Sequence, residues 1–489
     1  MTEALSASKL ADLPPEMLDF TLLKPAGALV PRLGRLSIPG RRTLLTPDFL
    51  GNTSRGAIPH ISQDNFGKTG LDGVYIALED FIEKHPQKTP PIFKLDTPDP
   101  LRRFTALPKD TIFVLGARRQ PPIPSANANT NSEIGILTSV GFQVISSEYY
   151  AAAARKLQPD IVVGLADIPF GQPTVGLKRK DKMSDRTETW TRDIIAKRST
   201  IDKSEPRFNI FAPILPIAKE VQSWYLEHLL DDMVDKISGV AIYDSHLLDE
   251  LPEELQHLPR LSFDNPSSPH ELLRQVGLGM DLFTVPFVTD ATDAGIALDF
   301  TFPVPQKTNG TERRSLGMDM WKSEHTESVT PLTDGCKCYA CSKHHRAYIQ
   351  HLLSAKEMLG WVLIQFHNHE ILDAFFAGVR NSIDKGTFEQ DVATFEAFYE
   401  PKLPEKTGQG PRVRGYQFKA QDHGKSTKRN PKAYKSLQVP LNAFHGQQPN
   451  PNPDVRDVID DDALVGLVGM EHVDPTEQLE GLKIEDDRS

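Results

Sequence analysis

The sequence lacks the features that mark membrane-spanning and secreted proteins. It has no apolar run approaching the roughly 18 residues that cross a bilayer, and its N-terminus has no basic region followed by an apolar one. Cysteine is scarce, with three in 489 residues. An odd and small number of cysteines excludes a disulfide framework and favours a reducing compartment. We therefore expect a cytoplasmic protein with no integral membrane segment.

Positive charge is in deficit overall but is unevenly distributed. The net charge is −11, yet residues 401–440 hold 10 basic and 2 acidic residues, and residues 451–489 hold 12 acidic and 3 basic ones. Proline, glycine, glutamine and asparagine are frequent between residues 403 and 456, which disfavours a packed core there. We expect 401–489 to be a mostly disordered tail, basic and then acidic, and 1–24 to be an N-terminal extension.

Short apolar segments alternate with helical patterns over residues 25–330. The helical patterns lie at 148–157, 217–237 and 269–279. The apolar segments show no strict alternation, which is typical of strands buried on both faces of a parallel sheet. There are eight of them, at 43–50, 110–117, 134–139, 161–167, 208–215, 239–244, 260–264 and 282–287. Eight strands with intervening helices favour an α/β fold, a (β/α)8 TIM-like barrel, over a doubly wound open sheet.

Residues 331–400 have a different character and predict a helical subdomain that completes the barrel. Two amphipathic helices are expected, one over 346–366 and one over 370–383, with a break at 367–369. Gly386 is expected to end the second helix. Thr387 and Gln390 match a capping box that would begin a third helix.

All three cysteines fall within six residues, as Cys336, Cys338 and Cys341. Three thiolates and one imidazole form a closed tetrahedral zinc site, which is structural because it leaves no position for a reacting water. The spacing alone does not choose the fourth ligand, since His345, His351 and His367 all follow the cysteines. We predict one structural Zn²⁺ ion, which contributes to folding and not to catalysis.

The order of these motifs resembles that of the tRNA-guanine transglycosylases. The similar segments are C-x-C-x2-C, an HN pair 31 residues after the first cysteine, LLTPDFL, GFQVIS, and DNPSSPHELLRQVGLGMDLF, and they extend the resemblance over most of residues 25–390. The resemblance implies a (β/α)8 barrel with a zinc-bearing insertion. It also implies that His367, the histidine of the HN pair, is the fourth zinc ligand.

Two carboxylates of the family pattern are absent. The family uses one aspartate as nucleophile in GVDMFD, where this chain has Thr284, and a second at the start of DSGGFQ, where this chain has Thr138. A threonine hydroxyl does not replace a carboxylate without a strong base beside it. The VQGG turn that admits the base is replaced by APIL at 212–215. Asp167 matches the family's base-recognising aspartate, but a locally bonded carboxylate is the simpler interpretation.

A barrel of this kind with no catalytic residue resembles the accessory subunits of eukaryotic queuine tRNA-ribosyltransferases, as does the early loop at 50–64. The resemblance implies a heterodimer with a catalytic queuine tRNA-ribosyltransferase subunit, formed through the zinc-bearing region. That pair replaces guanine by queuine at the wobble position of tRNAs with GUN anticodons. The resemblance also allows peripheral attachment to the mitochondrial outer membrane.

Two basic regions are candidates for contact with tRNA phosphates: 401–440, and the cluster of Lys178, Arg179, Lys180 and Lys182. Charge runs are more often solvated surface. Two other functions remain as alternatives. One is an active transglycosylase that uses a displaced carboxylate, Asp281, Asp290 or Asp293, and the other is a stand-alone zinc-containing RNA-binding scaffold.

Overall fold

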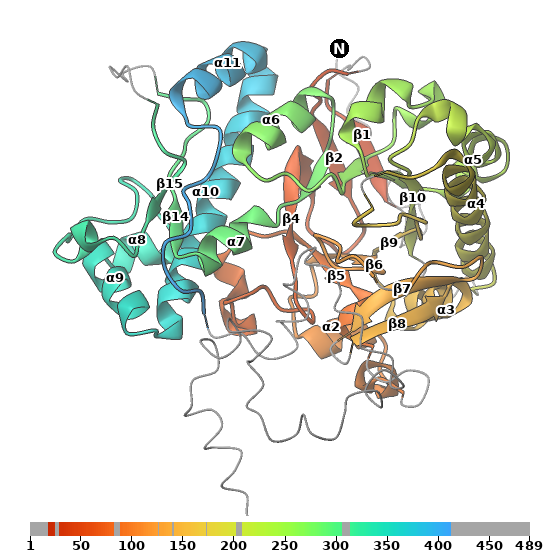
Figure 1. The fold of residues 1–489 in the computed structure, drawn as a ribbon, viewed down its shortest axis with the longest axis horizontal. Helices are drawn as coiled ribbons and strands as arrows, with labels where there is room; N and C mark the ends of the chain where they lie inside the picture. The colour runs from red at the N-terminus through yellow and green to blue at the C-terminus, as the bar shows by residue number, and fades with distance from the viewer. Residues whose placement is uncertain are drawn as a thin grey trace, which may run out of the picture. The chain divides into compact units, whose positions relative to one another are not determined.

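The computed structural model describes residues 18–24, 29–82, 89–125, 127–138, 141–172, 174–201, 208–305 and 313–411. Eight parallel strands close into a barrel at its centre (Figure 1). In chain order they are β4 (Asp48–Asn52), β5 (Gly73–Ala77), β6 (Ile112–Gly116), β9 (Ile161–Val163), β10 (Asn209–Ile214), β11 (Gly239–Ile242), β12 (Arg260–Ser262) and β13 (Leu282–Thr284). The first and last strands close the barrel, with Leu282 opposite Asp48. The predicted barrel is confirmed.

The expected set of barrel strands needs two corrections, one segment that does not belong to it and one strand that it lacked. The segment at 134–139 is not a barrel strand: β7 (Glu133–Thr138) pairs antiparallel with β8 (Gly141–Ser146) in a separate hairpin. The barrel instead uses β5, which is buried at every position and which the apolar segments above did not include. Its sequence runs directly into a 3-10 turn at Leu78–Asp80, so its apolar pattern fits a short helix as well as a strand.

Helices surround the barrel. They are α2 (Pro100–Thr105), α3 (Ser147–Leu157), α4 (Leu177–Ser199), α5 (Ser223–His228), α6 (Pro269–Gly277), α7 (Phe287–Asp293), α8 (Tyr339–Lys343), α9 (Arg346–Ser354), α10 (Met358–Lys385) and α11 (Phe388–Phe398). The expected helix at 217–237 is broken, because α5 passes into a π-helical turn at Leu229–Met233 and a 3-10 turn at Val234–Lys236. None of the helices in the described ranges is both long and apolar enough to cross a membrane.

Two antiparallel sheets flank the barrel. β1 (Asp19–Leu22), β2 (Gly34–Ser37) and β3 (Leu44–Thr46) form one of them before the barrel begins. β14 (Ile296–Leu298) and β15 (Gly317–Asp319) form the other after β13, next to α8 and α9 on the left of Figure 1.

The C-terminal helices differ from the expected pattern at two points. The break lies at residues 355–357, between α9 and α10, and α10 runs without interruption through His367, Asn368 and His369. Gly386 ends α10 in the left-handed conformation, as predicted. The third helix, α11, begins after Thr387, as predicted. The capping box itself is wrong, because the Thr387 hydroxyl donates to the Asp391 carboxylate and accepts no backbone N–H of α11.

Helix α10 belongs to two hydrophobic cores. Phe375 and Phe376 lie in the core shared with the barrel, where the Phe376 ring stacks on Phe49 of β4 at 5.6 Å between centroids. Trp361 and Ile364 lie in a second core with residues of α8 and α9. One helix therefore connects the barrel to the cysteine-bearing segment. The domain boundaries at 24, 330 and 400 stay predictions, and nearly all of the predicted tail lies outside the described residues.

Candidate metal centre and barrel mouth

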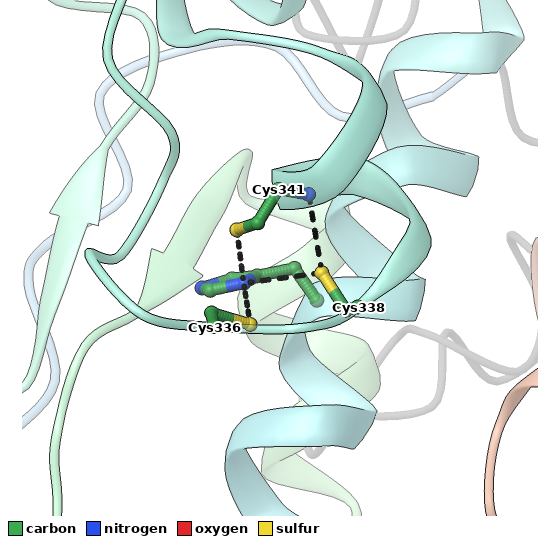
Figure 2. Close-up of side chains that lie close together, drawn as sticks. Cys336, Cys338 and Cys341 are labelled. Carbon is green, nitrogen blue, oxygen red and sulfur yellow. Dashed lines mark hydrogen bonds between the residues drawn. The ribbon is translucent and has the colours of Figure 1, made fainter.

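The cysteines and His367 meet in one place (Figure 2). Cys336 precedes α8, Cys338 caps its N-terminus by accepting the backbone N–H of Cys341, and Cys341 lies within the helix. His367 comes from the middle of α10, and the four ligand atoms lie within 4.8 Å of one another. Three sulfur atoms on one tight turn thus face one imidazole on a long helix.

The distances fit a single bound metal ion. The sulfur atoms of Cys341, Cys336 and Cys338 lie 3.4, 3.6 and 3.8 Å from His367 Nδ1. A tetrahedral ion with metal–sulfur bonds of about 2.3 Å and a metal–nitrogen bond of about 2.0 Å would separate sulfur and nitrogen by about 3.5 Å. The Cys3His group could therefore hold a metal ion without rearrangement.

The second ring nitrogen of His367 fixes which atom faces the sulfurs. His367 Nε2 lies 2.8 Å from the carbonyl oxygen of Leu298 in β14. Because a carbonyl oxygen only accepts hydrogen bonds, Nε2 carries the proton and Nδ1 keeps a lone pair for the ion. A hydrogen bond of this kind orients most metal-bound histidines.

The neighbouring sulfurs also change the acidity of the group. Burial alone would lower the pKa of His367, but Cys336 and Cys341 outweigh it and raise the pKa to about 9. Hydrogen bonds from the Cys336 and Cys338 thiols lower the pKa of Cys341. Without an ion the cluster therefore favours a thiolate next to a protonated imidazole, and a bound metal ion would replace the proton that lies between Nδ1 and the sulfur atoms.

The two other candidates for the fourth ligand, His345 and His351, do not lie in the cluster. His345 caps α9, where its Nδ1 accepts the backbone N–H of Tyr348. His351 is exposed on α9. Neither belongs to the group that the geometry brings together, so the choice that the spacing left open falls on His367.

The adjacent Asn368 ties α10 to the same strand. β15 covers only one edge of β14, and on the other edge Asn368 accepts the backbone N–H of Leu298 at 2.8 Å and donates to the carbonyl oxygen of Ile296 at 3.0 Å. The HN pair therefore completes the hydrogen bonds of an edge strand with two side chains. Burial lowers the pKa of His369, the next residue, to about 4. The Gln365 carboxamide donates a hydrogen bond to its ring.

The carboxyl ends of the eight barrel strands form the mouth, where the active sites of such barrels lie. The cavity there is about 30 Å³, lined among others by Tyr75, Gly116, Arg118, Gly164 and Tyr243. That volume holds about two water molecules, far below the roughly 300 Å³ of a typical ligand pocket. This agrees with the expectation for APIL at 212–215, since the ring of Pro213 lies 2.8 Å from where a Cβ of Gly164 would be.

Both threonines are buried and bonded to backbone. The Thr284 hydroxyl lies at the end of β13, 3.4 Å from the carbonyl oxygen of Ser262, and the Thr138 hydroxyl donates to the carbonyl oxygen of Gly141 at 2.9 Å. A backbone carbonyl oxygen is not a base that could take the proton of a hydroxyl that donates to it. Neither group is arranged as a nucleophile.

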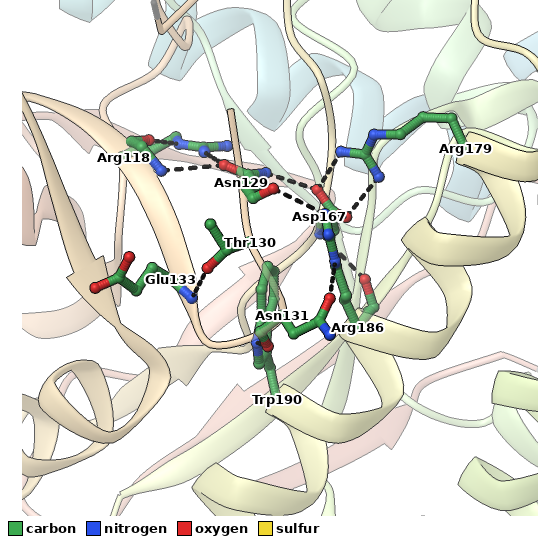
Figure 3. A network of polar contacts seen from close by, with 11 residues as sticks. Arg118, Asn129, Thr130, Asn131, Glu133, Asp167, Arg179, Arg186 and Trp190 are labelled. Atoms are coloured by element: carbon green, nitrogen blue, oxygen red, sulfur yellow. Dashed lines mark hydrogen bonds and ion pairs between the residues drawn. The ribbon is translucent and has the colours of Figure 1, made fainter. Parts of the chain in front are cut away.

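Asp167 is surrounded by side chains of this chain (Figure 3). Arg179 of α4 makes a bidentate ion pair with it at 2.6 Å for both contacts, and Arg186 adds a third at 3.1 Å. Asn129 donates to Asp167 Oδ1 at 2.7 Å. The carboxylate is fully buried and its oxygens are occupied. The simpler interpretation, a locally bonded carboxylate, fits these contacts.

Asn129 was not among the residues singled out by sequence. Its side-chain oxygen accepts the backbone N–H of Gly135 at 3.0 Å and a guanidinium N–H of Arg118 at 3.1 Å. The following residue but one, Asn131, is held to α4 by Arg186 and Trp190. The carboxamide of Asn129 thus connects the segment before β7 to the mouth, because its NH2 group donates to Asp167 and its oxygen accepts from Gly135 and Arg118. The sequence gave no signal for the role of Asn129, because the segment before β7 is polar and has no periodicity.

The displaced carboxylates do not converge on the mouth. Asp281 precedes β13 at the opposite end of the barrel, where it is fully buried and paired with Arg32 and with the backbone N–H of Arg260. Asp293 contacts the ring of His60 at 2.6 Å, and Asp290 is exposed on α7. Asp281 in particular holds a structural ion pair.

The chain is similar to known proteins of one family. Residues 28–401 match the family model described as queuine tRNA-ribosyltransferase, and the chain belongs to this family. A Schizosaccharomyces pombe relative named queuine tRNA-ribosyltransferase accessory subunit 2 is 35% identical over 403 residues, which is 81% of this chain and 87% of the relative. Relatives with the same name are 27% identical in Xenopus tropicalis and 25% identical in human, covering 73% and 74% of this chain and 94% and 95% of the relatives.

Replacing His367 by alanine should remove the bound metal. We expect the wild-type chain to carry about one ion, and the His367→Ala and Cys341→Ser variants to carry almost none and to unfold at lower denaturant concentration, because a structural ion contributes folding free energy. Metal content by mass spectrometry and a urea titration measure both. His351→Ala is the matched control and should retain the ion. An undiminished metal content in His367→Ala would contradict the assigned ligand set.

Acidification should release the same ion. Protons compete with the ion for the thiolates and the imidazole, so occupancy should be full at neutral pH and fall as the pH is lowered. Dialysis at a series of pH values followed by metal analysis measures the transition.

Asp167→Ala should destabilise the fold. The change leaves Arg179 and Arg186 without their carboxylate, which costs about 3 kcal/mol in the free energy of unfolding when a buried pair is broken. Asp185→Ala, on the exposed face of α4, should stay within about 0.5 kcal/mol of the wild type. If the two variants were equally stable, Asp167 would not be the structural group described here.

Proposed function

We propose that this chain is the non-catalytic subunit of a heterodimeric queuine tRNA-ribosyltransferase. Its role is to support the exchange of guanine for queuine at the wobble position of tRNAs with GUN anticodons, while a catalytic subunit performs the chemistry. One observation carries the proposal: the side chains at the barrel mouth bond to one another and leave about 30 Å³. The name that the relatives share, queuine tRNA-ribosyltransferase accessory subunit 2, supports it.

The metal is proposed to be Zn²⁺. Three thiolates and one imidazole are the donor set of closed structural zinc sites, and they leave no position for a substrate or a water. Cys336, Cys338, Cys341 and His367 would hold the ion. When bound, it supplies no Lewis-acid chemistry but fastens the turn at α8 to α10.

The partner and the location remain part of the proposal. The catalytic subunit is proposed to dock on the cysteine-bearing helical region, as the family resemblance implies. Contact with tRNA would use the start of α4, where Lys178 and Lys182 are exposed, whereas Arg179 is committed to Asp167. The basic segment at 401–440 falls almost entirely outside the described residues. We propose a cytoplasmic location, with peripheral attachment to the mitochondrial outer membrane as the further site that the resemblance allows.

Exchange of labelled guanine into a GUN-anticodon tRNA tests the proposal. The purified chain alone should give no incorporation, because Thr138 and Thr284 supply no carboxylate. Mixed with the catalytic subunit, it should give incorporation above that of the catalytic subunit alone. Incorporation by the chain alone would establish the displaced-carboxylate alternative. Tight tRNA binding by the chain alone, with no gain in the mixture, would favour the stand-alone scaffold.

A further inference from the structure

A groove beside α5 shares no lining residue with the cavity at the mouth or with the cysteine cluster. In a (β/α)8 barrel each strand is normally followed by a helix. Between β11 and β12 the chain instead forms two 3-10 turns, Ser245–Glu250 and Glu253–Leu255. These short turns leave one flank of α5 uncovered, and a groove of about 290 Å³ lies there.

The groove has an apolar floor and a mostly acidic rim, and Lys219 is the basic residue of its lining. Ser223, Glu227 and Leu230 line one wall at the i, i+4 and i+7 positions of α5 and the turn that continues it, and Leu226 lies beneath them. Pro252, Glu253 and Glu254 form the facing wall. Leu226 and Pro252 are buried, whereas Glu227, Glu253 and Glu254 are exposed. Within the described ranges, no basic side chain is paired with these three carboxylates.

The charge around the groove excludes one class of partner and favours another. Residues 219–255 contain ten acidic and two basic residues. A surface of this sign repels nucleic-acid phosphates and attracts cations. The tRNA that the proposed function requires therefore has no favourable contact here.

An exposed tryptophan adjoins the groove. Trp224 is 55% exposed, its ring lies 4.0 Å from the ring of His228, and it stands three residues before Glu227 on the same helix. Tryptophan is enriched among residues that dominate binding energy at protein interfaces, and its face attracts cations.

We propose that this groove docks a basic segment of a second protein by taking up a lysine or arginine side chain. The alkyl part of that side chain would cover Leu226 and Leu230, and its charged group would lie among Glu227, Glu253 and Glu254. Long cationic side chains combine these two kinds of contact. Trp224 would contact the same segment from the rim. This surface is separate from the one proposed for the catalytic subunit, so the inference goes beyond the proposed function.

A labelled peptide tests the groove directly. The probe is an eight-residue capped peptide of alternating leucine and arginine, titrated with the full chain and followed by fluorescence anisotropy. Replacing Glu253 and Glu254 by glutamine should weaken binding at least about tenfold, because two carboxylates in contact with the cation are lost. The matched control is Asp231→Asn with Asp235→Asn, which removes the same charge from exposed positions outside the groove and should change affinity by less than about threefold.

Each outcome decides the proposal. Selective weakening by the Glu253 and Glu254 pair supports a docking groove. Equal weakening by both pairs would overturn it in favour of a diffuse acidic surface, and so would a wild-type chain that does not bind the peptide. A single-stranded RNA that displaces the peptide would also overturn it. Thermal unfolding of both double variants checks that their fold is intact, as expected for exposed side chains.

Discussion

The arrangement of the C-terminal third depends on the two ring nitrogens of His367. One faces three sulfur atoms and the other donates to a carbonyl oxygen of β14. The same helix sends Phe375 and Phe376 into the barrel core. A metal ion at this point would therefore connect the α8 turn, an edge strand and the barrel through one side chain. The position of the cysteine-bearing helices follows from this coupling, because their own core is small.

The buried carboxylate of Asp167 at the barrel mouth is paired within the chain itself. A buried carboxylate is stable only when it is paired and hydrogen-bonded. Asp167 meets this requirement with two arginines and one asparagine of the same chain, so a ligand would have to displace them. The loss of two aspartates and the filling of the mouth agree with each other. A filled interior is compatible with the proposed non-catalytic role.

The fold class and the metal cluster could be predicted from the sequence because their signals are local. Buried parallel strands leave short apolar segments, and three cysteines within six residues leave a motif. The errors come from contacts between distant residues. The polar triplet His367, Asn368 and His369 suggested a break in a helix, but its partners on β14 lie about 70 residues away and keep the helix intact. Asn129 gave no signal, because its role depends on Asp167 and Arg118 meeting across the mouth.

The central claim, that the chemistry of the complex resides on the partner, is tested most directly by locating the covalent intermediate. The family resemblance implies that an aspartate attacks the ribose carbon and leaves the RNA attached to the protein. The assembled heterodimer, incubated with tRNA and quenched by denaturation, can be separated into its subunits and analysed by mass spectrometry for attached nucleotides. The account predicts the adduct on the catalytic subunit alone. An adduct on this chain, at Asp281, Asp290, Asp293 or any other carboxylate, would contradict it.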